Sequence, residues 1–143
     1  MRWTYSHLSL DESPHPDGTQ ILRPIVPLTL AAETTPLTGV VDSGSPISAA
    51  NAALFGDMGI DIDNDEPLYE VGLTIGGRSA RAPVFAVTLW LHPPDPGERA
   101  VSWRLPLMAR RAWTFPFAVL LGQRGWFDRF PTRIDATSTV VEV

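Results

Sequence analysis

The chain has 143 residues, which favours a single domain, and its 44% of apolar residues is enough for a hydrophobic core. A net charge of −5 does not suit a protein that binds phosphate backbones, and the absence of cysteine excludes disulfide scaffolds, thiol nucleophiles and Cys-ligated zinc. We expect one domain over residues 1–143, in which 1–20 form an N-terminal extension or edge strand. No signal peptide or transmembrane segment is recognisable, so a cytoplasmic location is the expectation.

Short strands are predicted along most of the chain. Fourteen prolines and eleven glycines separate runs rich in Val, Ile, Leu, Thr and Trp. Since Pro breaks helices and Gly weakens them, this pattern is typical of an all-β protein. In chain order, the predicted strands cover residues 3–10, 21–30 with interruptions at two prolines, 37–41, 67–75, 80–91, 100–107, 117–121, and the segments around 134 and 140–143.

One or two short helices are also predicted. Residues 47–55 are the best candidate, because Ser45 is able to cap such a helix, Pro46 suits its first turn and Gly56 is able to end it. Residues 125–130 are the second candidate, as a single helical turn before a proline.

The triplet Asp42-Ser43-Gly44 is the strongest functional signal. It follows the apolar strand predicted at 37–41, so a carboxylate stands at the end of a buried strand. A charge in such a place is unfavourable unless it is paired or its pKa is shifted, and proteins tolerate that cost mainly where chemistry needs it. The plain alternatives are a turn residue or a helix cap.

A second signal, Val119-Leu120-Leu121-Gly122, lies about eighty residues downstream. Its leucines would form an apolar floor beneath the loop of Asp42, and Gly122 would permit close backbone approach. Gly44 would bring its N–H close to the carboxylate, and the Ser43 hydroxyl would brace two such loops against each other.

Peptide hydrolysis by carboxylates needs two of them, which share one proton and activate a water. The chain has one Asp-Ser-Gly triplet, so the second carboxylate would come from a second copy. A two-fold interface places a residue opposite its own twin, and we therefore infer a homodimer in which each subunit supplies Asp42.

A glycine-tipped hairpin is predicted at Ile75, Gly76 and Gly77, between the strands at 67–75 and 80–91. Such a tip is able to open for substrate and to close over it, which would make it a flap that contacts substrate. The plain alternative is an ordinary hairpin turn.

The order of these features resembles the retropepsin-like aspartic proteases, and especially small bacterial single-lobe members, in which a run similar to residues 121–130 recurs. The resemblance spans residues 21–143. It implies a closed all-β barrel, an obligate dimer, a catalytic Asp42 and a flap near residues 75–78.

Three positions differ from the family pattern. Ser43 stands where retroviral members usually have Thr, Ser45 stands where Ala is frequent, and Arg78 follows a single glycine pair. The last two differences bear on substrate specificity and on flap motion, and none of the three removes the carboxylate.

Other functional classes fit less well. The triplet lacks the flanking glycines of a chymotrypsin-like nucleophile, and the three histidines lie in no triad context. The acidic run from Asp57 to Glu66 has Glu66 and Gly72 where a calcium-binding EF-hand loop would need Gly and Glu, so we interpret it as a solvated turn.

The sequence therefore predicts an aspartic endopeptidase of retropepsin-like fold that hydrolyses peptide bonds as a homodimer. Asp42 is the catalytic residue, Ser43, Gly44 and Gly122 support it, and Ile75, Gly76 and Gly77 contact the substrate. The expected partners are a peptide or protein substrate and a second copy of the chain, with no metal, cofactor, nucleic acid or membrane. The alternative is a catalytically inactive peptide- or protein-binding module of the same fold.

Overall fold

The computed structural model describes residues 1–9, 20–30, 35–75 and 78–143, and the regular secondary structure in this part of the chain is almost all strand. It contains a single short helix, α1 (Ala53–Asp57). The strands are β1 (Arg2–Thr4), β2 (Ser6–Ser9), β3 (Gln20–Arg23), β4 (Ile25–Leu30), β5 (Leu37–Val41), β6 (Ala49–Asn51), β7 (Tyr69–Ile75), β8 (Arg78–Leu91), β9 (Val101–Arg110), β10 (Val119–Leu121), β11 (Arg133–Asp135) and β12 (Val140–Glu142). The predicted all-β class is confirmed.

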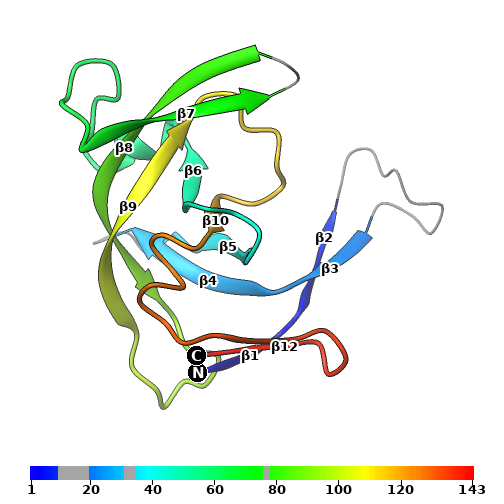
Figure 1. Cartoon of the computed structure of the whole chain (residues 1–143). Coiled ribbons are helices and arrows are strands. Elements are labelled where there is room, and N and C mark those ends of the chain that lie inside the picture. The colour runs from blue at the N-terminus through cyan, green and yellow to red at the C-terminus, as the bar shows by residue number, and fades with distance from the viewer. Residues whose placement is uncertain (10–19, 31–34, 76–77) are drawn as a thin grey trace.

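A strongly curved sheet of seven strands forms the body of the molecule (Figure 1). Its order is β4-β5-β10-β6-β9-β8-β7, and β4 also pairs with the end of β8 from Leu28–Leu91 to Leu30–Leu89. The sheet therefore folds back on itself, but β7 stays outside this pairing. The sequence predicted a closed barrel, and this prediction is wrong. The two end strands of the sheet order, β4 and β7, do not pair with each other.

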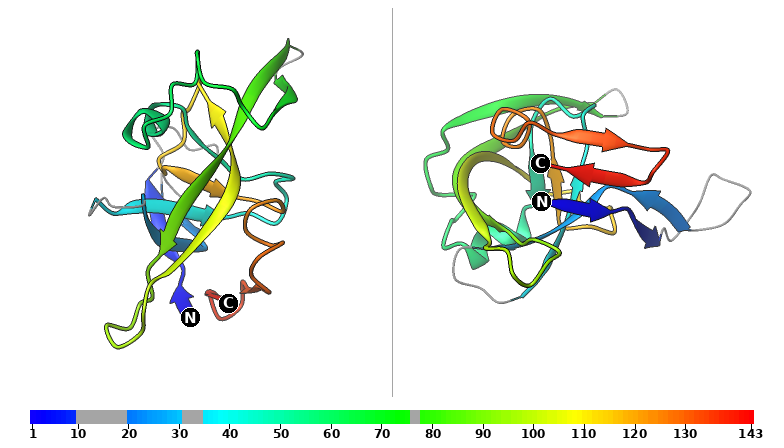
Figure 2. Two further views of the ribbon diagram at one scale, coloured as in Figure 1. Left: turned by 90° about the vertical axis from the view of Figure 1, so that its left-hand side faces the viewer. Right: turned by 90° about the horizontal axis from the view of Figure 1, so that it is seen from below.

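The predicted hairpin is present as β7 and β8, paired antiparallel from Tyr69–Val84 to Ile75–Arg78. β8 continues far beyond this hairpin and pairs with β9 from Val84–Met108 to Leu91–Val101. The hairpin is therefore an extension of the central sheet, and its two strands extend away from the body (Figures 1 and 2). Gly76 and Gly77 lie outside the described residues.

Two smaller sheets complete the architecture. β1, β12 and β11 form a sheet that brings the two ends of the chain together, and the Met1 ammonium group donates a hydrogen bond to the Val143 carbonyl at 2.8 Å. β2 and β3 form a separate two-stranded ribbon that projects from the body (Figures 1 and 2). The single strand predicted at 3–10 is thus two strands in different sheets.

Apolar side chains form two clusters on the two faces of the large sheet. The main cluster includes Phe55 and Leu89, and it is closed by Trp103 and Trp126, whose ring centroids lie 5.9 Å apart. The second cluster is smaller. Its buried members are Ile47, Ala49, Ala82, Val84 and Met108, and the partly buried Tyr69, Val71, Trp113 and Leu120 pack against it.

The helix predicted at 47–55 is largely wrong. Ala49–Asn51 form β6, which pairs with β10 on one side and with β9 on the other, and only Ala53–Asp57 are helical. Small alanines fit a narrow space between two strands, and tertiary pairing outweighs their helix propensity. Ser45 does not cap the helix, because it donates to the Ile47 carbonyl. The N-cap residue is Ala52, which forms no side-chain cap hydrogen bond, and the Ala53 N–H donates to the Asn51 side chain.

The predicted helical turn at 125–130 corresponds to a run of turns in which the Phe130 N–H donates to the Trp126 carbonyl at 2.8 Å. Within the described part of the chain, no helix has the length and apolar character needed to cross a membrane.

Candidate active site

Asp42 directly follows β5, at the edge of the sheet where β10 also ends. These two strands are parallel neighbours, with Val40 opposite Leu120 and Val41 opposite Leu121. The Asp42 N–H continues this pairing by donating to the Leu121 carbonyl at 2.9 Å. The two sequence signals, eighty residues apart, therefore meet at one point of the molecule.

A tight turn shapes the backbone after Asp42. The Gly44 N–H donates to the Asp42 Oδ1 at 2.9 Å, and the Ser45 N–H donates to the Asp42 carbonyl at 3.3 Å. A Cβ at Gly44 would lie only 3.2 Å from Asp42 Oδ1, so glycine keeps the space beside the carboxylate open. The Asp42 side chain is half-buried, while Ser43 and Gly44 are exposed.

Gly122 holds the loop of Asp42 against the end of β10. A Cβ added at Gly122 would lie 2.7 Å from the Ile47 carbonyl atoms and 2.8 Å from the Ser45 oxygen. These neighbours are backbone atoms, which cannot rotate away as a side chain can. No residue other than glycine fits here without displacing the loop.

Two residues that the sequence analysis did not select complete this contact. The fully buried Ser48 hydroxyl accepts the Gly122 N–H at 3.0 Å and donates to the Arg124 carbonyl at 2.8 Å. Gln123 donates its backbone N–H to the Ser45 carbonyl and its side-chain amide to the Ser43 carbonyl, both within 2.8 Å. The signal for Ser48 was a hydroxyl inside an apolar run, because a buried hydroxyl needs partners.

Strand alternation sets the direction of the Asp42 side chain. Val41 and Leu121 belong to the main cluster, whereas Leu120 packs on the second cluster. Successive side chains of a strand point to opposite faces, so Asp42 belongs with Leu120 on the face of the second cluster. The sequence predicted that both leucines form a floor beneath the Asp42 loop. Leu120 lies on this face, whereas Leu121 is buried in the main cluster.

The β7–β8 hairpin borders the same face. Tyr69 and Val71 of β7 pack on the second cluster, together with Ala82 and Val84 of β8. Ile75 pairs with Arg78 at the far end of the hairpin. The predicted flap residues Ile75, Gly76 and Gly77 thus belong to a hairpin whose base lies on the Asp42 face, although positions 76 and 77 are outside the described residues.

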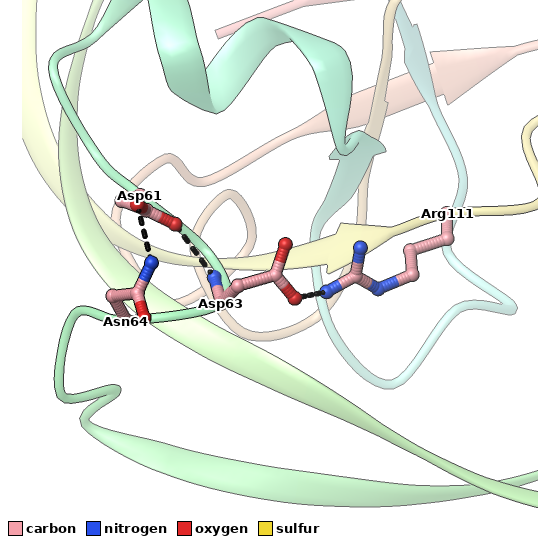
Figure 3. Close-up of polar contacts among 4 residues, drawn as sticks. All are labelled: Asp61, Asp63, Asn64 and Arg111. Atoms are coloured by element: carbon pink, nitrogen blue, oxygen red, sulfur yellow. Dashed lines mark hydrogen bonds and ion pairs between the residues drawn. The ribbon is translucent and has the colours of Figure 1, made fainter.

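The acidic turn at residues 61–65 is organised by its own hydrogen bonds (Figure 3). Asp61 accepts from the Asn64 side-chain amide at 2.7 Å and from the Asp63 N–H at 3.0 Å, and Arg111 forms an ion pair with Asp63. The hydrogen bond from Asn64, followed by that from the Asp63 backbone, lowers the pKa of Asp61. Within the described ranges, no group of three acidic, His or Cys side chains is arranged to hold a metal ion.

No protein-family model matches the chain, and no curated protein matches it either. Solved structures do match. The chain is similar to the retroviral protease-like domain of Ddi1 from Leishmania major, with a TM-score of 0.51, 14% identity, and coverage of 85% of this chain and 87% of that one. It is also similar to a retropepsin-like aspartic protease from Rickettsia conorii, with a TM-score of 0.53, 13% identity, and coverage of 97% and 92%.

The chain has a retropepsin-like fold. At these identities the likeness concerns the backbone and not the chemistry of any one side chain. Within this retropepsin-like fold, Asp42 directly follows β5 and is half-buried on the face bordered by the β7–β8 hairpin.

Proposed function

We propose that the protein is an aspartic endopeptidase that acts as a homodimer, in which the Asp42 side chains of two subunits form the catalytic pair. The observation that supports this proposal most is the position of Asp42. Its carboxylate stands in a turn fixed by Gly44, Gly122 and Ser48, on the face that carries the hairpin and the second apolar cluster. A rigid scaffold of this kind positions a reacting group.

The chemistry follows from two carboxyl groups that share one proton. The ionised Asp42 accepts a proton from a water molecule, and this water attacks the carbonyl carbon of the peptide bond. The protonated Asp42 of the other subunit donates a hydrogen bond to the carbonyl oxygen as negative charge develops there. The C–N bond of the tetrahedral intermediate then breaks, and the Asp42 carboxyl group that took the proton from water gives it to the leaving amine nitrogen. Because water is the nucleophile, no covalent intermediate with the protein forms.

Several neighbours have roles in this proposal. Ser43 is exposed beside Asp42, where its hydroxyl would bond across the two-fold axis and brace the paired loops. The edge of the β7–β8 hairpin, from Ile75 through Gly76 and Gly77, would bind the extended peptide by strand addition.

The decisive experiment replaces Asp42 with Asn and measures cleavage of a diverse peptide library at mildly acidic and neutral pH. We expect cleavage by the natural chain and a loss of at least about a hundredfold in the variant, which lacks the general base. Asp95→Asn, in an exposed loop, is the matched control and should retain activity. Equal cleavage by the Asp42 variant and the natural chain would remove Asp42 from the mechanism.

A statine-type inhibitor, which mimics the tetrahedral intermediate, separates an enzyme from an inactive peptide-binding module. An enzyme binds such a mimic more tightly than it binds substrate, because its site is complementary to the transition state. Tight binding that disappears in Asp42→Asn supports the peptidase. Binding of peptides without preference for the mimic would favour the module.

A further inference from the structure

A cluster of partly exposed aromatic side chains extends the second apolar cluster beyond the sheet. It consists of Trp113, Phe115 and Phe117, in the connection between β9 and β10. The Phe115 and Phe117 rings are stacked with centroids 5.0 Å apart, and Trp113 packs edge-on against both at 5.1 and 5.7 Å. The Trp113 indole N–H fixes the connection by donating to the Phe117 carbonyl. Since Trp113 also packs on the second cluster, this aromatic cluster belongs to the Asp42 face.

Arg110 lies against this aromatic cluster. Its guanidinium carbon is 5.1 Å from the centroid of the Phe115 ring, so the ring covers the guanidinium group. Arg110 alternates with Ala109, which is in the main cluster, and it therefore shares the face of Met108 in the second cluster. Its side chain is half-buried.

This arginine has no counter-ion within the described part of the chain. The ion pairs found there involve Arg81, Arg111 and Arg133. The Arg110 Nε is buried and has no hydrogen-bond acceptor among the described residues. A partly desolvated cation beside apolar groups is costly unless an anion meets it, and guanidinium groups suit carboxylates. The neighbouring Arg111 differs, because Asp63 already pairs with it (Figure 3).

The distance between Arg110 and Asp42 determines how many residues would separate a substrate carboxylate at Arg110 from the bond that is cleaved. Arg110 is in register with Asn51, while Ile47 touches Gly122 beside the Asp42 loop. Asn51 follows Ile47 by four positions, which in extended chain corresponds to about 13 Å. An extended peptide that crosses the second cluster from Asp42 would therefore reach Arg110 with a group on the order of four residues from the reacting bond.

We propose that Arg110 binds a carboxylate of the peptide substrate, several residues from the bond that is cleaved. This inference rests on the proposed peptidase function and deepens it, because it makes peptides with a carboxylate at that distance the preferred substrates. The carboxylate belongs either to an acidic side chain or to the peptide's C-terminus. The aromatic cluster holds the Arg110 guanidinium group in place. The second cluster contacts the apolar substrate residues that lie between Asp42 and Arg110.

The test measures binding by fluorescence anisotropy, with Asp42→Asn in the full chain so that peptides are not consumed. The probes are labelled, end-blocked peptides with a central Leu-Phe pair and a single Glu, each matched with a Gln counterpart, with the Glu moved along the sequence. A further pair differs only in a free or amidated C-terminus, which separates the two sources of carboxylate. At one position, or with the free C-terminus, we expect about tenfold tighter binding of the charged peptide.

Substitution of the two neighbouring arginines then locates the effect. Arg110→Gln, added to Asp42→Asn, should abolish the preference, while binding of the uncharged peptide stays the same and shows that the variant is folded. Arg111→Gln is the matched control and should keep the preference. Equal affinity for charged and uncharged peptides at every position would overturn the inference, and so would a preference that survives in Arg110→Gln.

Two outcomes separate this inference from the proposed function. Cleavage by the natural chain without any preference for a carboxylate overturns the role of Arg110 and leaves the peptidase standing. A preference that depends on Arg110, without cleavage by the natural chain, supports carboxylate binding by Arg110 and overturns the peptidase function. If Arg110→Gln instead changes self-association in sedimentation and not peptide preference, the carboxylate belongs to a second copy, and the inference is wrong.

Discussion

At the scale of single residues, the candidate site depends on side chains that are absent or small. Gly44 leaves space beside the Asp42 carboxylate, and Gly122 permits contact between its own backbone and that of Ile47. Ser48 is the smallest side chain that can both accept the Gly122 N–H and donate to the Arg124 carbonyl. The position of the carboxylate thus follows from backbone contacts, which these three residues make possible.

Gly122→Ala tests this directly. The added Cβ would lie within 2.8 Å of three backbone atoms of Ser45 and Ile47, so the Asp42 loop has to move. We expect the free energy of unfolding in urea to fall by about 1–3 kcal/mol, as for other overpacked sites. Peptide cleavage should fall as well, because the carboxylate shifts with its loop.

Gly97→Ala is the control for this substitution, since a Cβ at Gly97 would have no neighbouring atom within 4 Å. It should leave both stability and cleavage near those of the natural chain. Unchanged urea unfolding in Gly122→Ala would mean that the loop accommodates a methyl group and that the close contact does not determine its position.

At the scale of elements, the sequence predicted strands better than their connections. The alternation and turn residues around 37–41, 67–75 and 80–91 located β5, β7 and β8, because these strands carry local patterns. β6 was missed because its alanines favour a helix locally, and only the flanking strands β9 and β10 make it a strand. Pairing partners that lie far apart in sequence leave no local pattern.

The same limit applied to the site. The Asp42 triplet and Gly122 were visible as motifs, and the structure brings them together through the parallel pairing of β5 and β10. Ser48 and Arg110 carried no motif, and Gln123 was visible only as a member of the run 121–130, because the roles of these residues come from what lies beside them in space. The face on which Asp42 lies follows from the packing of Val41 and Leu120 on opposite clusters, which no local sequence pattern records.

The turn between β11 and β12 makes a prediction that belongs to this scale. Asp135 accepts hydrogen bonds from the backbone N–H groups of Thr137 and Ser138, both at 3.0 Å. These bonds, with the one from the Ser138 N–H the largest cause, lower the pKa of the partly exposed Asp135 carboxyl from 3.8 to about 2. A lowered folded-state pKa stabilises the fold above the unfolded value of 3.8, and this contribution is lost as the pH falls towards about 2.

We therefore expect Asp135→Asn to flatten the dependence of stability on pH between about 4 and about 2. Chemical unfolding of both proteins at several pH values measures this. Ser138→Ala, which removes a hydroxyl that also lowers this pKa, should give an intermediate slope. Parallel curves for Asp135→Asn and the natural chain would show that the turn does not hold the carboxylate in this way.

At the scale of the whole molecule, one chain supplies one Asp42, and the proposed mechanism needs two. The sheet of β1, β12 and β11 and the two-stranded ribbon of β2 and β3 lie at the periphery of the body (Figures 1 and 2). If activity requires a symmetric pair, both subunits of a dimer must carry Asp42. The activity of dimers that mix natural and Asp42→Asn subunits measures this requirement.

Equal amounts of the natural chain and of Asp42→Asn are mixed, allowed to exchange subunits and assayed at constant total protein. Random pairing makes about a quarter of the dimers fully natural, so activity should fall to about a quarter of that of the unmixed natural chain. A mixture with Gly97→Ala in place of Asp42→Asn should keep full activity. Activity of about one half would mean that each chain works alone, which a shared pair of carboxylates does not allow.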